Sequence, residues 1–107
     1  MAELLINDRE EFTRRVGFRL LFGLINDEYI DKIFELMLFC EHEDKYYVNM
    51  IIAWLIAECF VKQRNKTLDF LKIYKNRFAV NKAISKCYDS FRVSNEDKSM
   101  LKQFRLN

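Results

Sequence analysis

The segment YVNMIIAWLIAECFVK, residues Tyr47–Lys62, decides the fold of this 107-residue chain. When its residues are placed at the roughly 100° steps of an α-helix, two apolar stripes appear on different sides. One stripe comprises Val48, Ile52, Leu55 and Cys59, and the other comprises Met50, Ala53, Ala57 and Val61. A helix with two apolar stripes is covered by neighbours on both sides. We therefore expect this helix in the middle of a stack of helices, not at the edge of a small bundle.

The composition predicts one helical domain over residues 1–107. Half of the residues are apolar, ten are phenylalanine, two are glycine and none is proline. Sheets and long loops depend on turn residues, so their scarcity favours helices joined by short connections. The longest apolar run, Val48–Val61, is shorter than the roughly 20 residues of a membrane span. We therefore expect a soluble protein without a membrane partner.

The cysteines and the N-terminus predict a cytoplasmic location. Cys40, Cys59 and Cys87 lie far apart among apolar residues, which is typical of reduced thiols. No basic segment precedes a long apolar run near the start, so no secretory signal is recognisable.

Apolar periodicity predicts six helices, beginning near residues 8, 27, 45, 65, 78 and 94. Asp8 with Glu11 resembles a capping box, Asn76 suits the end of the fourth helix, and Ser94 caps the sixth. Apart from the third helix, whose stripes are given above, each helix has one expected inner face. These faces are Phe12, Val16 and Leu20 on the first helix; Ile30, Ile33, Phe34, Met37 and Leu38 on the second; Leu68, Leu71 and Tyr74 on the fourth; Val80, Ala83, Ile84, Cys87 and Tyr88 on the fifth; and Met100, Leu101 and Phe104 on the sixth.

The odd-numbered helices begin near residues 8, 45 and 78, a period in the mid-thirties. Each period would hold one antiparallel helix pair, which is the spacing of an α-solenoid. We predict an all-α fold of this kind, although helical bundles of similar size also exist.

Charge is distributed unevenly along the chain. Residues 1–53 hold six basic and eleven acidic residues, a net charge of −5, whereas residues 54–107 hold twelve and five, a net charge of +7. A basic half points to an anionic partner, often a nucleic acid. The alternative is a solvated basic face without any partner.

A candidate nucleic-acid surface follows from cations repeated on alternate helices. Arg15 and Arg19 lie one turn apart on the first helix, as do Lys82 and Lys86 on the fifth. Like charges at this spacing repel, so an anion lying across them would explain the arrangement. A phosphate backbone would suit the cations, and the indole of Trp54 could meet a base or sugar. Alternatively, Trp54 packs in the core and the cations are merely solvated, and Glu11, one turn before Arg15, could also weaken the repulsion.

Enzymatic chemistry has little support in the residue pattern. Cys40 and His42 offer two metal ligands without a second cluster, so we expect no metal site and a surface position for His42. No cysteine–histidine pair and no glycine-rich phosphate loop are recognisable. Glu58 could act as a general base in an apolar site, but we expect it to pair with a cation on a neighbouring helix. No catalytic residue and no cofactor are predicted.

Three separated segments resemble the C-terminal end of the DNA alkylation repair (AlkD-like) family. They are Tyr-Val-Asn-Met-x-x-Ala-Trp-x-x-x-Glu over residues 47–58, Asn-Lys-Ala-Ile over 81–84, and Arg-Val-Ser-x-Glu-Asp-Lys over 92–98. Phe12–Phe18 resembles the arginine-bearing helix of the family. The resemblance implies an α-solenoid of HEAT-like antiparallel helix pairs with a basic concave cleft. Active members of the family are glycosylases that excise alkylated purines from duplex DNA.

Within this resemblance, Arg15 matches the cleft arginine beside the lesion and Trp54 matches a cleft tryptophan. Lys82 falls more loosely in a helix that approaches the DNA backbone, and Arg14 could replace Arg15 if the spacing differs by one residue. Family members are longer, and their catalytic aspartate lies upstream in a motif resembling Trp-Trp-Asp, which this chain lacks. The chain therefore resembles the C-terminal half of such a protein.

The resulting functional hypothesis is a C-terminal segment that forms part of a DNA-binding cleft and has no glycosylase activity alone. The alternative is a non-enzymatic HEAT-like scaffold that binds a protein or a nucleic-acid backbone. Because a severed solenoid exposes an apolar repeat face, we also expect a homodimer in which Leu4, Leu5 and Ile6 with the first helix contact a second copy.

Overall fold

The structure, a computed structural model, describes residues 2–107, and this part of the chain is helical without a strand. Its elements are α1 (Ala2–Ile6), α2 (Glu11–Leu20), the 3₁₀ turn η1 (Leu21–Leu24), α3 (Ile30–Phe39), α4 (Tyr46–Lys62), α5 (Arg64–Leu71), α6 (Arg77–Tyr88), α7 (Asn95–Leu101) and the 3₁₀ turn η2 (Lys102–Phe104). The predicted all-α class is confirmed. The short helix α1 was not expected.

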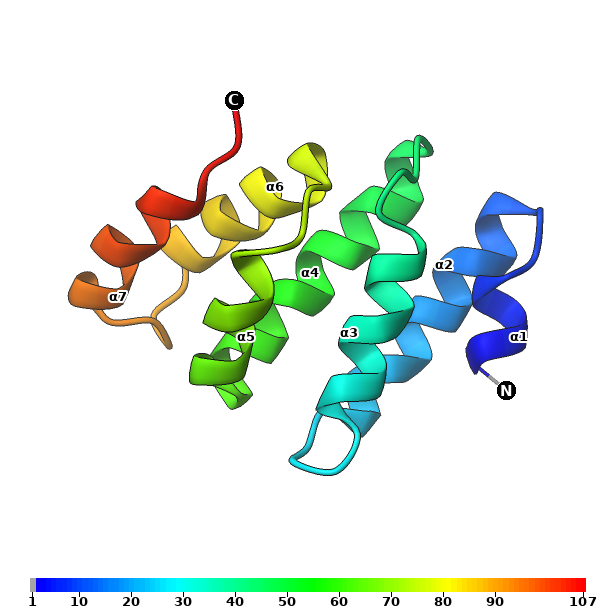
Figure 1. Cartoon of the computed structure of the whole chain (residues 1–107), viewed down its shortest axis with the longest axis horizontal. Helices are drawn as coiled ribbons and strands as arrows, with labels where there is room; N and C mark the ends of the chain where they lie inside the picture. The colour runs from blue at the N-terminus through cyan, green and yellow to red at the C-terminus, as the bar shows by residue number, and fades with distance from the viewer. Residues whose placement is uncertain (1) are drawn as a thin grey trace.

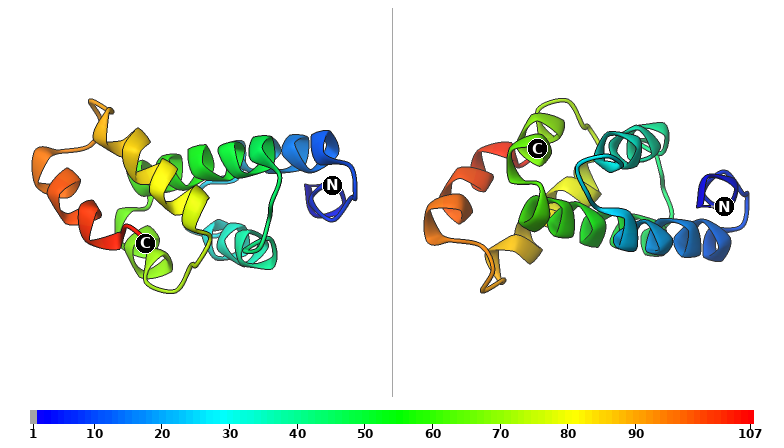
Figure 2. Two further views of the ribbon diagram at one scale, coloured as in Figure 1. Left: turned by 90° about the horizontal axis from the view of Figure 1, so that it is seen from above. Right: turned by 90° about the horizontal axis from the view of Figure 1, so that it is seen from below.

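Alternate helices form a row. Helix α4 packs against α2 on one side and against α6 on the other, so the three lie side by side in chain order (Figure 1). Helices α3 and α5 lie together on one side of this row (Figure 2), while α7 packs against α6 and α1 against α2. The predicted middle position of α4 is confirmed.

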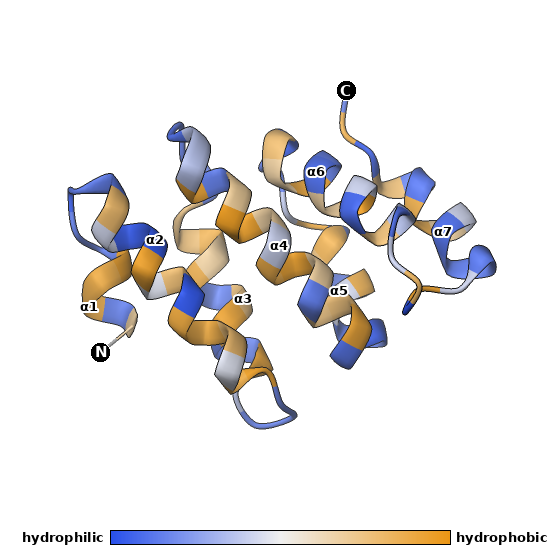
Figure 3. Cartoon of the chain, turned by 180° about the vertical axis from the view of Figure 1, so that it is seen from behind, coloured by the Kyte–Doolittle hydropathy of each residue, from blue (hydrophilic) through white to orange (hydrophobic). Residues whose placement is uncertain are grey.

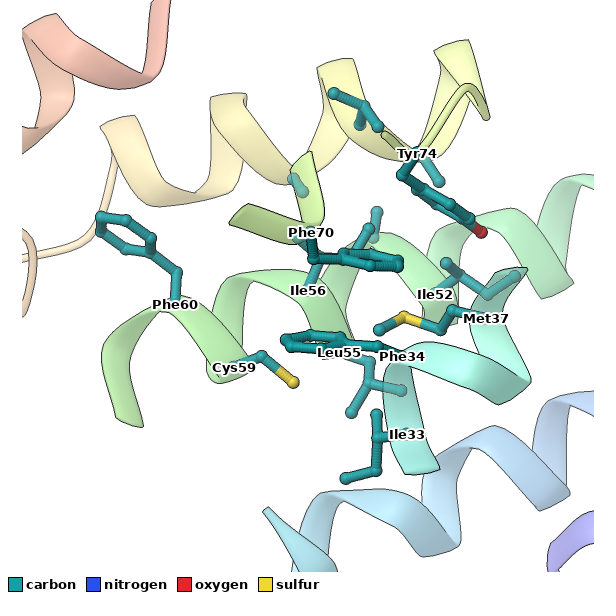
Figure 4. Packing of buried hydrophobic residues seen from close by; sticks show 14 of the residues in the cluster. Ile33, Phe34, Met37, Ile52, Leu55, Ile56, Cys59, Phe60, Phe70 and Tyr74 are labelled. Carbon is teal, nitrogen blue, oxygen red and sulfur yellow. The ribbon is translucent and has the colours of Figure 1, made fainter. Parts of the chain in front are cut away.

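Burial on α4 is complete for the first predicted stripe and partial for the second, in which Met50, Ala57 and Val61 are half-buried. Val48, Ile52, Leu55 and Cys59 are fully buried, as is Ala53 from the second stripe. Helix α4 is apolar over most of its length (Figure 3). Above it, the ring of Phe34 from α3 stacks on that of Phe70 from α5 at 4.4 Å between centroids (Figure 4). The core therefore lies between the row and the second layer.

The expected inner face of the first helix is wrong. Phe12, Val16 and Leu20 are 63%, 39% and 45% exposed, whereas Phe18 and Leu21 are fully buried. Helix α2 carries apolar residues on two sides, and the packing of α1 and α4 selects the side that contains Phe18. Tyr88 and Leu38, also expected inside, are exposed at the rims of α6 and α3.

The contact between α1 and α2 depends on Gly17. A Cβ at this position would lie 2.8 Å from Cγ1 and 2.9 Å from the backbone nitrogen of Ile6, which is too close for any side chain. The absence of a side chain lets α1 cover α2, and Ile6 is consequently buried in the core. The expectation that Ile6 faces a second copy is therefore wrong, whereas Leu4 is 77% exposed.

Two predicted caps are wrong and one is confirmed. The cap of α2 is Glu10, whose carboxylate accepts from the backbone N–H of Thr13 at 2.9 Å. Asn76 does not end a helix with a left-handed residue; its side chain caps the start of α6 by accepting from the N–H of Ala79. Ser94 caps α7 as predicted, since its Oγ accepts from the N–H of Asp97 at 3.1 Å.

In residues 2–107, no helix has both the length and the apolar character that crossing a membrane requires.

Candidate nucleic-acid interface

A groove runs along the exposed side of the α2–α4–α6 row. It has a volume of about 260 Å³, and its lining side chains come from α2 (Arg15), α4 (Tyr46, Tyr47, Met50, Ile51 and Trp54) and α6 (Lys86). We call it the cationic groove. No Asp or Glu lines it among the described residues, so both of its charged side chains are cations. The structure thus brings together three of the five predicted site residues, Arg15, Trp54 and Lys86.

Aromatic faces hold the cations of the groove in place. The guanidinium of Arg15 lies 5.8 Å from the ring centroid of Tyr47, and Nζ of Lys86 lies 5.3 Å from that of Trp54. Each such contact at an exposed site contributes about 0.5–1 kcal/mol. Neither cation forms a salt bridge with a described residue, although Arg15 also lines a pocket with Glu10 and Glu11, and Lys86 lines a cavity with Glu58 and Asp89.

Arg19 adjoins the groove through a third contact between a cation and an aromatic ring. Its guanidinium lies 4.7 Å from the ring centroid of Phe22, and this ring meets Trp54 edge-on at 6.1 Å. Phe22 and Tyr47 thus belong to the candidate surface, and neither is among the five predicted site residues. The signal that could have found them is the alternation of aromatic and cationic residues on adjoining helices.

Trp54 is a surface residue and does not pack in the core. Its side chain is 53% exposed, whereas its chain neighbours Ala53 and Leu55 are fully buried. The alternative placement of Trp54 in the core is therefore wrong. An exposed indole beside an ammonium group presents a flat apolar surface to a ligand next to a positive charge.

Glu58, one turn after Trp54, forms the expected ion pair, but its cation comes from a loop and not from a neighbouring helix. Its carboxylate accepts from both terminal nitrogens of Arg92, which lies in the segment between α6 and α7. The pair lines a neighbouring cavity of about 290 Å³, to which Trp54 and Lys86 also contribute. Glu58 thus ties the segment after α6 to α4, beside the groove.

Arg14 cannot replace Arg15 in the groove, because all three nitrogens of its guanidinium already donate hydrogen bonds within the protein. Nε and one terminal nitrogen each donate to the carboxylate of Glu43 at 2.9 Å, and the other donates to the carbonyls of Asp8 and Arg9. These hydrogen bonds to Glu43 raise the pKa of Arg14.

The Arg14–Glu43 pair continues into a chain of hydrogen bonds. The carbonyl of Glu43 accepts from the side chain of Asn49 on α4, whose own oxygen accepts from Asn76 at the start of α6, both at 2.9 Å. We call Arg14, Glu43, Asn49 and Asn76 the polar network. It connects α2, α4 and α6, the three helices that carry the groove.

Lys82, the fifth predicted residue, lines a different pocket. That pocket lies along α6 and shares only Tyr46 with the cationic groove. Lys82 is exposed there, near the groove but outside its lining.

The thiols have no reactive environment. Burial raises the pKa of Cys59 to about 12 and that of Cys87 to about 11, so both are protonated at neutral pH. His42 is a surface residue, with a side chain that is 95% exposed. Across residues 2–107, no group of three or more His, Cys, Asp or Glu side chains could hold a metal ion.

Comparison with known proteins adds no relative: no protein-family model, no curated protein and no solved structure matches the chain.

Proposed function

We propose that this chain binds the phosphate backbone of duplex DNA through the cationic groove, without catalysing a reaction by itself. The observation that carries the proposal is the convergence of Arg15, Trp54 and Lys86 from α2, α4 and α6 on one groove without a described acidic residue. Phosphate oxygens would meet the cations, and the indole would pack against a sugar or base. Lys82 would contact the backbone beyond the end of the groove.

The resemblance to the DNA alkylation repair family supports the same surface. Its cleft arginine and cleft tryptophan correspond to Arg15 and Trp54, which share the groove. In that interpretation the row and the second layer are HEAT-like helix pairs of an α-solenoid, and the chain supplies part of the cleft wall. The catalytic carboxylate would come from a region that this chain does not contain. We therefore expect no base release from alkylated duplex DNA by the isolated chain.

Fluorescence anisotropy with a labelled duplex tests the proposal. Affinity should fall steeply between 50 and 200 mM salt, because each neutralised phosphate adds about −0.9 to the slope of log K against log salt. The double variant Arg15→Gln/Lys86→Gln should weaken binding at least tenfold and reduce the slope by about 2. Trp54→Ala should weaken binding while leaving the salt slope unchanged.

The matched control is Lys66→Gln/Lys72→Gln, which removes the same charge from α5 and the residue that follows it, outside the row. Both lysines are exposed and lie near carboxylates, Asp31 and Asp69 respectively. Equal losses for the two double variants would mean that only net charge matters, and the groove would not be the binding site.

A protein-binding scaffold is the second candidate, and the exposed apolar stripe of Phe12, Val16 and Leu20 favours it. An apolar protein contact responds little to salt, in contrast to phosphate binding. Duplex affinity that is absent at low salt, together with a salt-insensitive protein complex lost on Phe12→Ser, would select this function.

A further inference from the structure

A further surface pocket lies outside the cationic groove, along the exposed face of α6. Its volume is about 410 Å³, and it extends from Tyr46 at the start of α4 to Arg105 near the chain end. This volume falls in the range of small-molecule sites, roughly 300–1,000 Å³. The proposed function does not use this pocket, apart from a peripheral role for Lys82.

Three cations converge on the pocket without acidic partners. Arg77, Lys82 and Arg105 line it, and its described lining contains no carboxylate. None of the three forms a salt bridge with a described residue. Three other arginines, Arg14, Arg64 and Arg92, are bound to Glu43, Asp97 and Glu58. The cations at this pocket are thus left free for an external anion.

The chain end is held so that Arg105 faces this pocket. Asn81 on α6 donates to the carbonyl of Leu106 at 2.8 Å and accepts from its N–H at 2.9 Å. Oγ of Ser85 accepts from the guanidinium of Arg105 at 3.2 Å. The last residues therefore lie close to α6 (Figure 1), and one arginine is oriented before any ligand arrives. Such preorganisation lowers the entropic cost of binding.

Two aromatic rings form the other wall. Tyr46 and Phe78 meet edge-on at 5.6 Å between centroids, and they are 54% and 41% exposed. A planar base can stack on an exposed ring of this kind. Guanidinium groups match the geometry of phosphate oxygens, and a lysine adds a point charge. The pocket thus combines a site for a phosphate with a surface for a flat ring.

From this combination we propose that the pocket binds a mononucleotide unit, with its phosphate between Arg77, Lys82 and Arg105 and its base against Tyr46 and Phe78. The unit is either a free nucleoside 5′-monophosphate or the 5′-terminal nucleotide of a strand. The inference does not depend on the proposed function, because binding at this pocket requires neither Arg15 nor Trp54 nor Lys86.

Titration of the ¹⁵N-labelled full chain with adenosine 5′-monophosphate tests the inference. Signals of the side chains of Arg77, Arg105 and Asn81 should shift. Adenosine, which lacks the phosphate, should bind at least tenfold more weakly. Binding should tighten between pH 5 and 7, because the second ionisation of the phosphate lies near pH 6. Equal binding of the two probes, or no shifts at millimolar nucleotide, would overturn the inference.

Arg77→Gln/Arg105→Gln is the decisive variant. It should weaken nucleotide binding at least tenfold, whereas Lys66→Gln/Lys72→Gln, with the same change in charge, should leave it unaltered. Circular dichroism establishes that each variant is folded. Because Lys82, Arg15 and Lys86 remain in place, the salt slope of duplex binding should be retained in Arg77→Gln/Arg105→Gln. Nucleotide-induced shifts confined to Arg15, Trp54 and Lys86 would assign the ligand to the groove and overturn the inference.

Short single strands with a 5′-phosphate or a 5′-hydroxyl distinguish the two sources. A strand end is indicated if the phosphorylated strand binds more tightly than both the hydroxyl strand and the free nucleotide. A free nucleotide is indicated if the two strands bind equally and more weakly than adenosine 5′-monophosphate. Tight binding of both strands at Arg77 and Arg105, irrespective of the 5′ group, would overturn the assignment to a terminal or free phosphate.

Discussion

Arg14 and Arg15 are adjacent in the sequence, but Arg14 belongs to the polar network and Arg15 lines the cationic groove. In the polar network, Arg14 donates to Glu43, and both side chains are nearly buried, at 13% and 7% exposure. In the cationic groove, Arg15 is exposed, lies over the ring of Tyr47 and forms no salt bridge with a described residue. A nearly buried charge needs its partner for stability, whereas an exposed, unpaired charge contributes little to stability and is available for a ligand. We therefore expect Arg14 to contribute to stability and Arg15 to contribute to the proposed binding.

The largest expected effect is the difference in the free energy of unfolding between the variants Arg14→Ala and Arg15→Ala. Arg14→Ala should lower the free energy of unfolding by about 3 kcal/mol, because it leaves the carboxylate of Glu43 nearly buried and unpaired. Arg15→Ala should change it by about 0.5 kcal/mol or less. Urea denaturation followed by circular dichroism measures both values. Equal losses for the two variants would remove the distinction between network and groove.

Alanine at the two glycines, Gly17 and Gly23, should have different effects on stability, because only Gly17 lies in a close helix contact. Gly17→Ala should destabilise the protein by about 1–3 kcal/mol, since its Cβ would collide with the backbone of Ile6. At Gly23, a Cβ meets nothing within 4 Å, so Gly23→Ala should be neutral or stabilise by about 0.5 kcal/mol. Thermal unfolding of both variants checks this, and a stable Gly17→Ala protein would contradict the described contact between α1 and α2.

Self-association should be a smaller, concentration-dependent effect located on α2. Phe12, Val16 and Leu20 form an exposed apolar stripe at four-residue spacing, with Leu4 exposed on α1. We expect sedimentation at high micromolar concentration to show a dimer, and Phe12→Ser/Leu20→Ser to shift the protein towards the monomer. Lys86→Ala should leave the dimer intact, because this groove residue lies on α6 and does not adjoin the stripe on α2. A wild-type chain that stays monomeric would exclude this stripe as a dimer interface.

The smallest effect is a difference among the thiols. Cys59 and Cys87 should remain unlabelled by a thiol reagent at pH 8, because burial raises their pKa values to about 12 and 11 and keeps the thiols protonated. Burial also raises the pKa of Cys40, but this residue is only half-buried and should react first as the pH rises. Denaturation should expose all three. Mass spectrometry of the labelled native protein gives the number of modified cysteines. Rapid labelling of Cys59 in the native protein would contradict the packing of α4.

Much of the fold follows from local patterns. The two stripes of α4 predict its central position, because helical periodicity alone shows that both of its sides are apolar. Ser94 caps α7 as expected, since a serine that bonds the N–H three residues later needs no distant partner. The caps of α2 and α6 could not be assigned this way: several polar residues near each start compete, and the packed helix selects among them.

The candidate binding surface likewise depends partly on sequence patterns and partly on tertiary contacts. The repetition of cations on alternate helices and the position of Trp54 are features of the sequence, and they correctly indicate which helices carry the groove. The roles of Arg14 and Arg15 are different, because they depend on Glu43, a residue 29 positions away from Arg14. The pocket along α6 likewise needs Arg105, which the bonds between Asn81 and Leu106 bring to α6.

The sequence by itself determined that this protein is helical, that α4 is covered on two sides, and that charge is unevenly distributed between the two halves of the chain. These properties depend on residue type and on spacings of three or four residues along a single helix. Only the tertiary structure decided which side of α2 is buried, which arginine is paired and which cations face a pocket. Those outcomes depend on contacts between distant segments. For α2, the periodic pattern has two apolar sides and is equally compatible with burial of either side.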